Sequence, residues 1–117
     1  MAGQAVSSVI TVEIERKGDT ALVKLRGRLI AGVNDFVYSQ VRPLIPEVKR
    51  IVLDLAEVTQ MDSMGLGALV RLYVSARNAG SSLELMHLGK RIRELLGITH
   101  LLDVFTIIGE RGITFKF

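Results

Sequence analysis

The sequence contains no cysteine and no tryptophan, only two prolines, and only six phenylalanine and tyrosine residues in 117. The absence of cysteine excludes disulfides, thiolate metal sites and cysteine nucleophiles, and it fits a reducing compartment. With so few aromatic side chains, no stacking platform for single-stranded nucleic acid is visible. No apolar stretch reaches the roughly 18 residues needed to span a bilayer, and early charged residues interrupt any signal-peptide pattern. These absences predict a soluble cytoplasmic protein that has no membrane partner.

The length and composition fit one globular domain over residues 1–117. Apolar residues make up 49% of the chain and charged residues 23%, which is ordinary for such a domain. The net charge of +3 results from 15 basic and 12 acidic residues, and the only basic cluster is Lys90-Arg91-Ile92-Arg93. On a short helix such a cluster is typical of a solvated face, so we expect no direct nucleic-acid partner.

The middle of the chain holds the stretch on which the rest of the prediction depends. Residues 51–55 (Ile-Val-Leu-Asp-Leu) form the short apolar run expected of a central strand covered on both faces. Residues 56–62 predict a loop, and a helix begins at the next residue. Asp62 and Ser63 are both preferred helix-capping types. We therefore expect the Ser63 hydroxyl at the positive end of a helix dipole, beside the carboxyl end of a central strand, where open α/β sheets place functional crevices.

The helix that begins at this serine has two predicted faces. The face toward the core contains Leu66, Leu69, Val70, Leu72, Tyr73 and Ala76. The outward face contains Ser63, Met64, Gly67, Ala68, Arg71, Ser75 and Asn78. The start of the outward face carries small or soft residues, although an exposed helix surface is usually rich in Lys, Glu and Arg. Such a surface suits the close approach of another protein; equally, the glycines could let the helix pack tightly on its own sheet.

The remaining elements predict a single mixed sheet of the α/β class. Strands are expected at residues 6–14, 21–25, 51–55, 82–88 and 104–108, and helices from Asn34 or Asp35, from Ser63 and over 90–96. The order is β-β-α-β-α-β-α-β, in which an antiparallel hairpin precedes right-handed parallel crossovers with the helices packed on the sheet. Residues 112–117 alternate apolar and polar side chains, so this tail could add an edge strand or pair between subunits.

Catalytic chemistry finds little support in the sequence. His87 and His100 stand alone, and no spacing indicates a nucleophile and base. Asp54 and Asp62 lack the spacing of a divalent-metal site. The Gly65-Leu66-Gly67 run has neither the lysine nor the length of a phosphate loop. We therefore expect no enzymatic activity, no metal and no cofactor.

Ser63 is nevertheless a residue that can be modified. A phosphate there would add about −1.5 to −2 charges at the helix start. The helix dipole and free amides would stabilise it by about 0.3–1 kcal/mol, while Asp62 would oppose it. The fold should therefore tolerate the phosphate while the outer surface changes sign, which describes a switch read by a partner. From the residues alone, a plain N-cap role for Ser63 is the simpler alternative.

These segments resemble a bacterial STAS domain, and most closely the anti-sigma factor antagonists of that family. The resemblance rests on the strand at 51–55, the segment Met-Asp-Ser-Met-Gly-Leu-Gly-Ala-Leu at 61–69, and the strand at 80–88. It covers about residues 6–108 and implies the sheet-and-helix arrangement that the element order predicts. Asp54 matches the family's strand-end acid.

The resemblance also implies a mechanism and a site. Ser63 would be phosphorylated by a serine kinase that doubles as the anti-sigma factor. The unmodified protein would bind that kinase and free the sigma factor, the phosphorylated form would not bind, and a serine phosphatase would restore it. The implied partner-binding surface consists of Asp62, Met64, Gly65, Gly67, Ala68 and Arg71.

The chain departs from the family pattern in two places. Many antagonists close with a helix, whereas residues 109–117 form a β-like tail, and Met64 takes a position often held by a small residue. The alternative function is therefore an assembly module without a switch, such as a stressosome-like scaffold or the STAS subunit of a lipid transporter. A homodimer also stays open.

Overall fold

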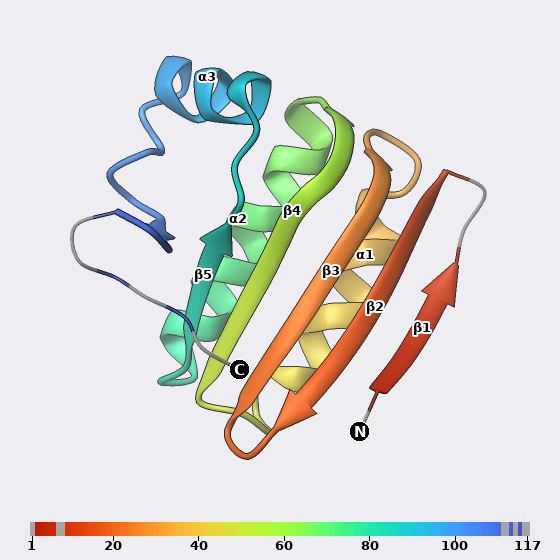
Figure 1. The fold of residues 1–117 in the computed structure, drawn as a ribbon, viewed down its shortest axis with the longest axis vertical. Coiled ribbons are helices and arrows are strands. Elements are labelled where there is room, and N and C mark those ends of the chain that lie inside the picture. Colours follow the sequence, from red (N-terminus) through yellow and green to blue (C-terminus); the bar gives the residue numbers. More distant parts are fainter. Residues whose placement is uncertain (1, 7–8, 111–112, 114, 116–117) are drawn as a thin grey trace.

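The computed structural model describes residues 2–6, 9–110, 113 and 115 of the chain. Six strands form one sheet in sequence order (Figure 1). The strands are β1 (Ala2–Val6), β2 (Ile10–Lys17), β3 (Thr20–Leu29), β4 (Arg50–Met61), β5 (Ser82–Met86) and β6 (Thr106–Ile107). The helices are α1 (Asn34–Val41), the 3-10 turn η1 (Arg42–Leu44), α2 (Ser63–Asn78) and α3 (Lys90–Ile98). The first three strands are antiparallel and β3 to β6 are parallel, which confirms the predicted mixed α/β sheet.

The helices α1 and α2 cover one face of the sheet (Figure 1). Because side chains alternate along a strand, every second residue of the inner strands points to this face. These residues are buried and form the core with the apolar sides of the two helices; they include Ile10, Val12, Ala21, Val23, Leu25, Ile51, Leu53, Leu55, Leu83 and Leu85. The core is thus a layer between the sheet and two helices, and it fixes the start of α2 at the end of β4.

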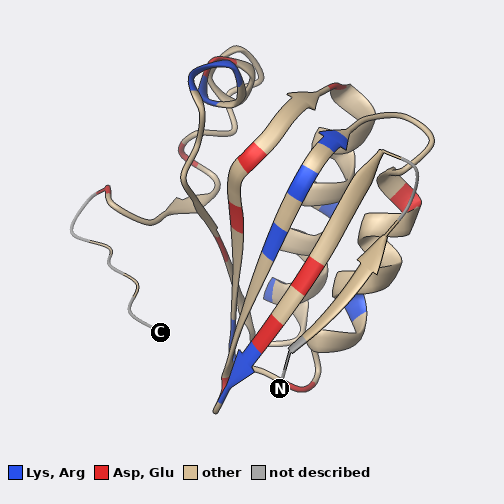
Figure 2. Ribbon diagram, turned by 45° about the vertical axis from the view of Figure 1, so that its right-hand side comes forward, with Lys and Arg blue, Asp and Glu red and all other residues tan. Residues whose placement is uncertain are grey.

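The opposite face of the sheet is charged. Figure 2 shows basic residues along β3 between acidic residues of β2 and β4. Lys24 lies in register with Glu13 on one side and Asp54 on the other. Arg26 Nε donates to Glu57 Oε2 at 3.1 Å. At the start of β4, the Arg50 guanidinium lies 5.2 Å from the ring centroid of Phe115, a described residue of the C-terminal segment.

Two strands differ from their prediction. The first predicted strand at 6–14 is two strands, since β1 ends at Val6 and β2 begins at Ile10. The predicted loop at 56–62 is wrong, because β4 continues to Met61 and pairs with β3 as far as Leu29, across two register shifts. Bulges of this kind leave a residue unpaired and bend the strand, and the pairing of β4 with β3 resumes after each of them.

The helices also differ at their ends. Val33 is the N-cap of α1 and Asn34 is its first residue, so neither Asn34 nor Asp35 caps this helix. The α-helix ends before Pro43, and the tighter turn η1 contains that proline, as its ring requires. Helix α3 includes the predicted basic cluster, and Lys90, Arg91 and Arg93 are exposed, which confirms a solvated face.

The C-terminal tail is described only in part. Gly109 N donates to the Ile113 carbonyl oxygen at 2.8 Å, which closes a turn. The predicted edge strand at 112–117 falls mainly outside the described residues. Among the helices of the described part of the chain, none is both long enough and apolar enough to cross a membrane.

Candidate functional site

The corner between β4 and α2 is held by the carboxylate of Asp62. This residue is the N-cap of α2, and its Oδ1 accepts hydrogen bonds from Met64 N at 3.0 Å and Gly65 N at 2.9 Å. Its other oxygen, Oδ2, accepts from Ala31 N at 2.9 Å. The backbone N–H groups of Ala31 and then Gly65 and Met64 lower the pKa of Asp62, because they stabilise its charged form. One carboxylate therefore ties the start of α2 to the loop after β3.

Ser63 is the first residue of α2, so it is not the N-cap and the capping alternative for it is wrong. Its side chain is exposed, and within the described residues its hydroxyl has no hydrogen-bond partner. The expectation that free amides would receive a phosphate needs correction as well. Two of the first amides, Met64 N and Gly65 N, already donate to Asp62. These two amides are therefore already occupied and are not available to a group attached to Ser63.

Gly65 places the start of α2 against the end of β3. It is buried, and a Cβ built there would lie 2.0 Å from the Leu29 carbonyl oxygen and 2.8 Å from its carbonyl carbon. No real Cβ approaches a backbone oxygen so closely, so only glycine lets the helix start sit at this depth. Gly65 therefore has a packing role at the site and offers no surface to a partner.

Three further residues of the predicted surface lie on the first turns of α2. Met64 is 51% exposed, and Gly67 is partly exposed with no atom within 4 Å of a Cβ built there. Ala68 is only 1% exposed, so its assignment to the outward face is wrong. It is buried in the folded chain, which the helical periodicity of one segment does not reveal. The small, accessible surface beside Ser63 consists of Met64 and Gly67.

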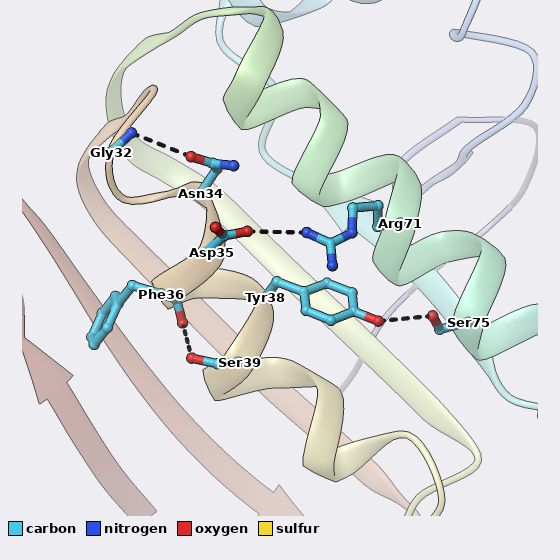
Figure 3. A network of polar contacts seen from close by, with 8 residues as sticks. All are labelled: Gly32, Asn34, Asp35, Phe36, Tyr38, Ser39, Arg71 and Ser75. Carbon is cyan, nitrogen blue, oxygen red and sulfur yellow. Dashed lines mark hydrogen bonds and ion pairs between the residues drawn. The ribbon is translucent and has the colours of Figure 1, made fainter.

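Arg71 lies two turns further along α2 and contacts α1 (Figure 3). Its Nη1 donates to Asp35 Oδ1 at 3.1 Å, and its guanidinium carbon lies 3.9 Å from the ring centroid of Tyr38. The Tyr38 hydroxyl and Ser75 Oγ form a hydrogen bond of 3.3 Å. That hydrogen bond, and after it the positive charges of Arg42 and Arg71, lower the pKa of Tyr38. Asp35 and Tyr38 could not be identified as site residues from the sequence, because their contact with Arg71 joins two separate helices.

Asp54 lies in the middle of β4, so it is not at the end of that strand. Its Oδ1 accepts from Ala56 N at 3.0 Å and pairs with His87 Nδ1 at 2.9 Å. His87 does not stand alone, contrary to the sequence prediction, and its φ of 59° places the backbone just after β5 in the left-handed region. Eight residues of extended strand separate Asp54 from Asp62 by roughly 25 Å. The two carboxylates therefore do not share a site.

A family model gives the family assignment. The model described as STAS domain matches residues 11–112 of the chain. The anti-sigma-B factor antagonist of Bacillus subtilis (strain 168) is 28% identical over 98 residues, which cover 84% of this chain and 90% of that protein. The anti-sigma-B factor antagonist of Listeria monocytogenes is 42% identical over 60 residues, or 51% of this chain and 53% of that protein. The match thus spans about half the length of the Listeria relative.

Solved structures show the same fold. The anti-sigma factor antagonist SpoIIAA in its unphosphorylated form has a TM-score of 0.71 at 17% identity, covering 85% of this chain and 89% of that one. The phosphorylated form of this Bacillus cell fate determinant has a TM-score of 0.67 at 17% identity, with coverages of 85% and 92%. An anti-sigma factor antagonist from Mycobacterium paratuberculosis has a TM-score of 0.77 at 18% identity, with both coverages at 87%. At these identities the similarity establishes the arrangement of sheet and helices.

Proposed function

Because the chain belongs to the STAS domain family, we propose that it is an anti-sigma factor antagonist in a partner-switching pathway. In this proposal the unphosphorylated protein binds an anti-sigma factor that is also a serine kinase, and the sigma factor is released. Phosphorylation of Ser63 ends the binding, and a serine phosphatase restores it. The domain acts by binding and performs no catalysis itself. The names of the relatives from Bacillus and Listeria support the role of antagonist.

The observation that carries the proposal is the position of the Ser63 hydroxyl. It is exposed on the first residue of α2, and Asp62 already occupies two of the amides that would otherwise bind a phosphate. A phosphate on Ser63 would therefore stay at the surface and place about −1.5 to −2 charges there. The neighbouring carboxylate of Asp62 adds to the negative potential. The modification would change the surface that a partner meets and leave the packing of the domain in place.

The surface next to Ser63 is suited to burial against a partner, which is the contact that phosphorylation would control. Gly67 leaves open space above the helix, and Met64 offers a flexible, half-exposed apolar side chain. Such small and soft groups allow a partner to approach closely and to exclude water. A doubly charged group inside that contact would have to lose its hydration without a pairing cation, which is strongly unfavourable. Phosphorylation would therefore oppose binding without any change of fold.

The proposal is tested in two steps with the full chain. Peptide mapping over residues 61–71 of protein isolated from its native cells should find a single phosphate on Ser63. Binding to the purified anti-sigma factor is then measured by calorimetry for Ser63→Ala, Ser63→Asp and the control Ser39→Asp. Ser39 is an exposed serine of α1, so its substitution adds the same charge away from the corner.

We expect Ser63→Ala and Ser39→Asp to bind as the unmodified protein does, and Ser63→Asp to bind at least tenfold more weakly. Equal affinity of Ser63→Asp and Ser63→Ala would reject the switch. Thermal unfolding of all three variants should stay close to that of the wild type, since both serines are exposed.

A further inference from the structure

We infer that Arg71 receives a carboxylate side chain of the partner protein, and that Tyr38 and Asp35 position its guanidinium for this contact. The inference rests on the proposed function and adds the chemistry of one contact on the same surface. It assigns a role to two residues of α1, Tyr38 and Asp35, that lie outside the β4–α2 corner.

The guanidinium of Arg71 is held from two sides (Figure 3). Its carbon atom lies 3.9 Å from the Tyr38 ring centroid, which is a close cation–π contact. Its Nη1 donates to Asp35 Oδ1 at 3.1 Å. The Tyr38 ring is itself held by the hydrogen bond of its hydroxyl with Ser75 Oγ at 3.3 Å. These contacts restrict the rotamers of a long side chain that would otherwise sample many.

The remaining donors of this guanidinium have no acceptor. An arginine carries five N–H groups, and within the described residues only Nη1 of Arg71 forms a hydrogen bond. The side chain of Arg71 is 53% exposed, so the other donors face solvent. An ordered guanidinium with a free edge matches the two oxygens of a carboxylate, to which it can donate two parallel hydrogen bonds. Because its rotamer freedom is already reduced, less entropy is lost when the partner binds.

A purely structural role explains this arrangement poorly. The side chains of Arg71 and Asp35 are 53% and 87% exposed, and exposed ion pairs contribute only about 0–1 kcal/mol to stability. The contact between α1 and α2 already has buried apolar side chains from both helices, including Val37 and Leu72. The stability of the helix pair therefore does not depend on an ordered arginine at its surface.

The position of Arg71 connects it with Ser63. Eight residues of α-helix separate the two Cα atoms by about 12 Å along the axis, and both side chains lie on the outer side of α2. Gly67 lies between them and has no side chain to obstruct a partner. A patch of about 800 Å², typical of one side of a stable interface, covers both residues. A partner that presents a carboxylate to Arg71 therefore brings negative charge close to Ser63. A phosphate on Ser63 would make the same surface negative.

The test uses the purified anti-sigma kinase as the probe and the phosphorylation of Ser63 as the readout. KM and kcat are measured for the wild type, Arg71→Ala, Arg71→Lys, Tyr38→Phe and Tyr38→Leu. The matched control is Arg77→Ala, since Arg77 is also exposed on α2 and donates to a tyrosine hydroxyl, that of Tyr73, at 3.1 Å. Thermal unfolding of each variant checks that the domain is folded.

We expect Arg71→Ala to raise KM about tenfold or more with little change in kcat, because the arginine is an anchor of the bound complex. Arg71→Lys should recover only part of this loss, since an ammonium lacks the planar pair of donors. Tyr38→Phe keeps the ring face but loses the hydrogen bond with Ser75, so it should raise KM less than Tyr38→Leu, which should raise KM several-fold. Arg77→Ala should leave KM unchanged.

Equal KM values for Arg71→Ala and Arg77→Ala would overturn the inference while the proposed function stands. If Tyr38→Leu matched Tyr38→Phe, the positioning role of the ring would be wrong. If the anti-sigma partner neither binds nor phosphorylates the wild-type protein, the proposed function fails and this inference fails with it.

Discussion

Two glycines of α2, only two positions apart, show how differently the inner and outer sides of this helix are built. Gly65 faces the end of β3, where a Cβ would lie 2.0 Å from a backbone oxygen. Gly67 faces outward, and a Cβ there would meet nothing within 4 Å. The inner side of the helix start thus tolerates no added atom, whereas the outer side has space left empty. Close packing explains the first glycine, whereas no neighbouring atom in the described residues requires the second.

This difference separates the stability of the corner from its recognition by a partner. The inner side, with Gly65 and the cap Asp62, determines where Ser63 is held. Under the proposed function, the outer side, with Gly67 and Arg71, is the surface that a partner would meet. Substitutions on the two sides should therefore affect different measurements, and the following variants are ordered by the size of the effect that we expect on stability.

The largest effect is expected for Gly65→Ala. The added methyl group would overlap the Leu29 carbonyl oxygen, and neither backbone can move without disturbing β3 or α2. We expect the free energy of unfolding to fall by about 3 kcal/mol, as for severe overpacking of a core. Urea unfolding followed by circular dichroism measures this change. A fall in the free energy of unfolding smaller than that caused by a typical surface substitution would show that the corner is not closely packed.

A smaller loss is expected for Asp62→Asn, and it should depend on pH. The N–H groups of Ala31, Gly65 and Met64 lower the pKa of Asp62 in the folded protein. The charged carboxylate therefore stabilises the fold above its ordinary pKa, and this contribution is lost as the pH falls through the lowered value. Urea unfolding should show the wild type more stable than the variant at about pH 7 and nearly equal to it at about pH 2. A difference that is independent of pH would contradict this account of the cap.

Gly67→Ala should have the opposite sign. Alanine favours a helix interior over glycine by about 1 kcal/mol, and the new methyl group has open space, so the urea midpoint should rise. If the outer side is a close-contact surface, the same variant should bind the anti-sigma factor more weakly. A variant that is both more stable and binds normally would show that Gly67 does not contact the partner.

The smallest effect on stability is expected for Arg71→Ala. Its ion pair with Asp35 is largely exposed, so we expect the free energy of unfolding to fall by less than about 1 kcal/mol. Arg71→Ala should therefore weaken binding to the anti-sigma factor more than Gly65→Ala does, although it lowers the free energy of unfolding less. A loss of several kcal/mol for Arg71→Ala would instead indicate that the arginine holds the two helices together.

The sequence predicted the parts of this fold that depend on local patterns. The apolar run at 51–55, the helix from Ser63 and the basic face of α3 follow from periodicity and are confirmed. The continuation of β4 to Met61 was missed, because residues beyond Leu55 are largely exposed and give no apolar run. Their strand conformation comes from pairing with β3, which lies about thirty residues earlier.

The sequence could not resolve the details of the site that depend on distant contacts. It allowed both Asp62 and Ser63 as caps. In the structure the Asp62 carboxylate also binds Ala31 N, a distant contact that the local pattern does not show. It also left open whether the glycines serve packing or recognition. Gly65 serves packing because Leu29 lies beside it, whereas Gly67 has no such neighbour and its contact with a partner stays a prediction. The pair of Asp54 and His87 likewise joins β4 to the segment after β5.

The most direct test of the central claim compares two forms of the wild-type protein. Protein phosphorylated on Ser63 to completion, as shown by intact mass, is titrated with the purified anti-sigma factor alongside the unmodified protein. We predict that the unmodified form binds and that the phosphorylated form shows no measurable binding at the same concentrations, while both unfold at similar temperatures. Equal affinities of the two forms would contradict the claim that the charge on Ser63 controls the partner.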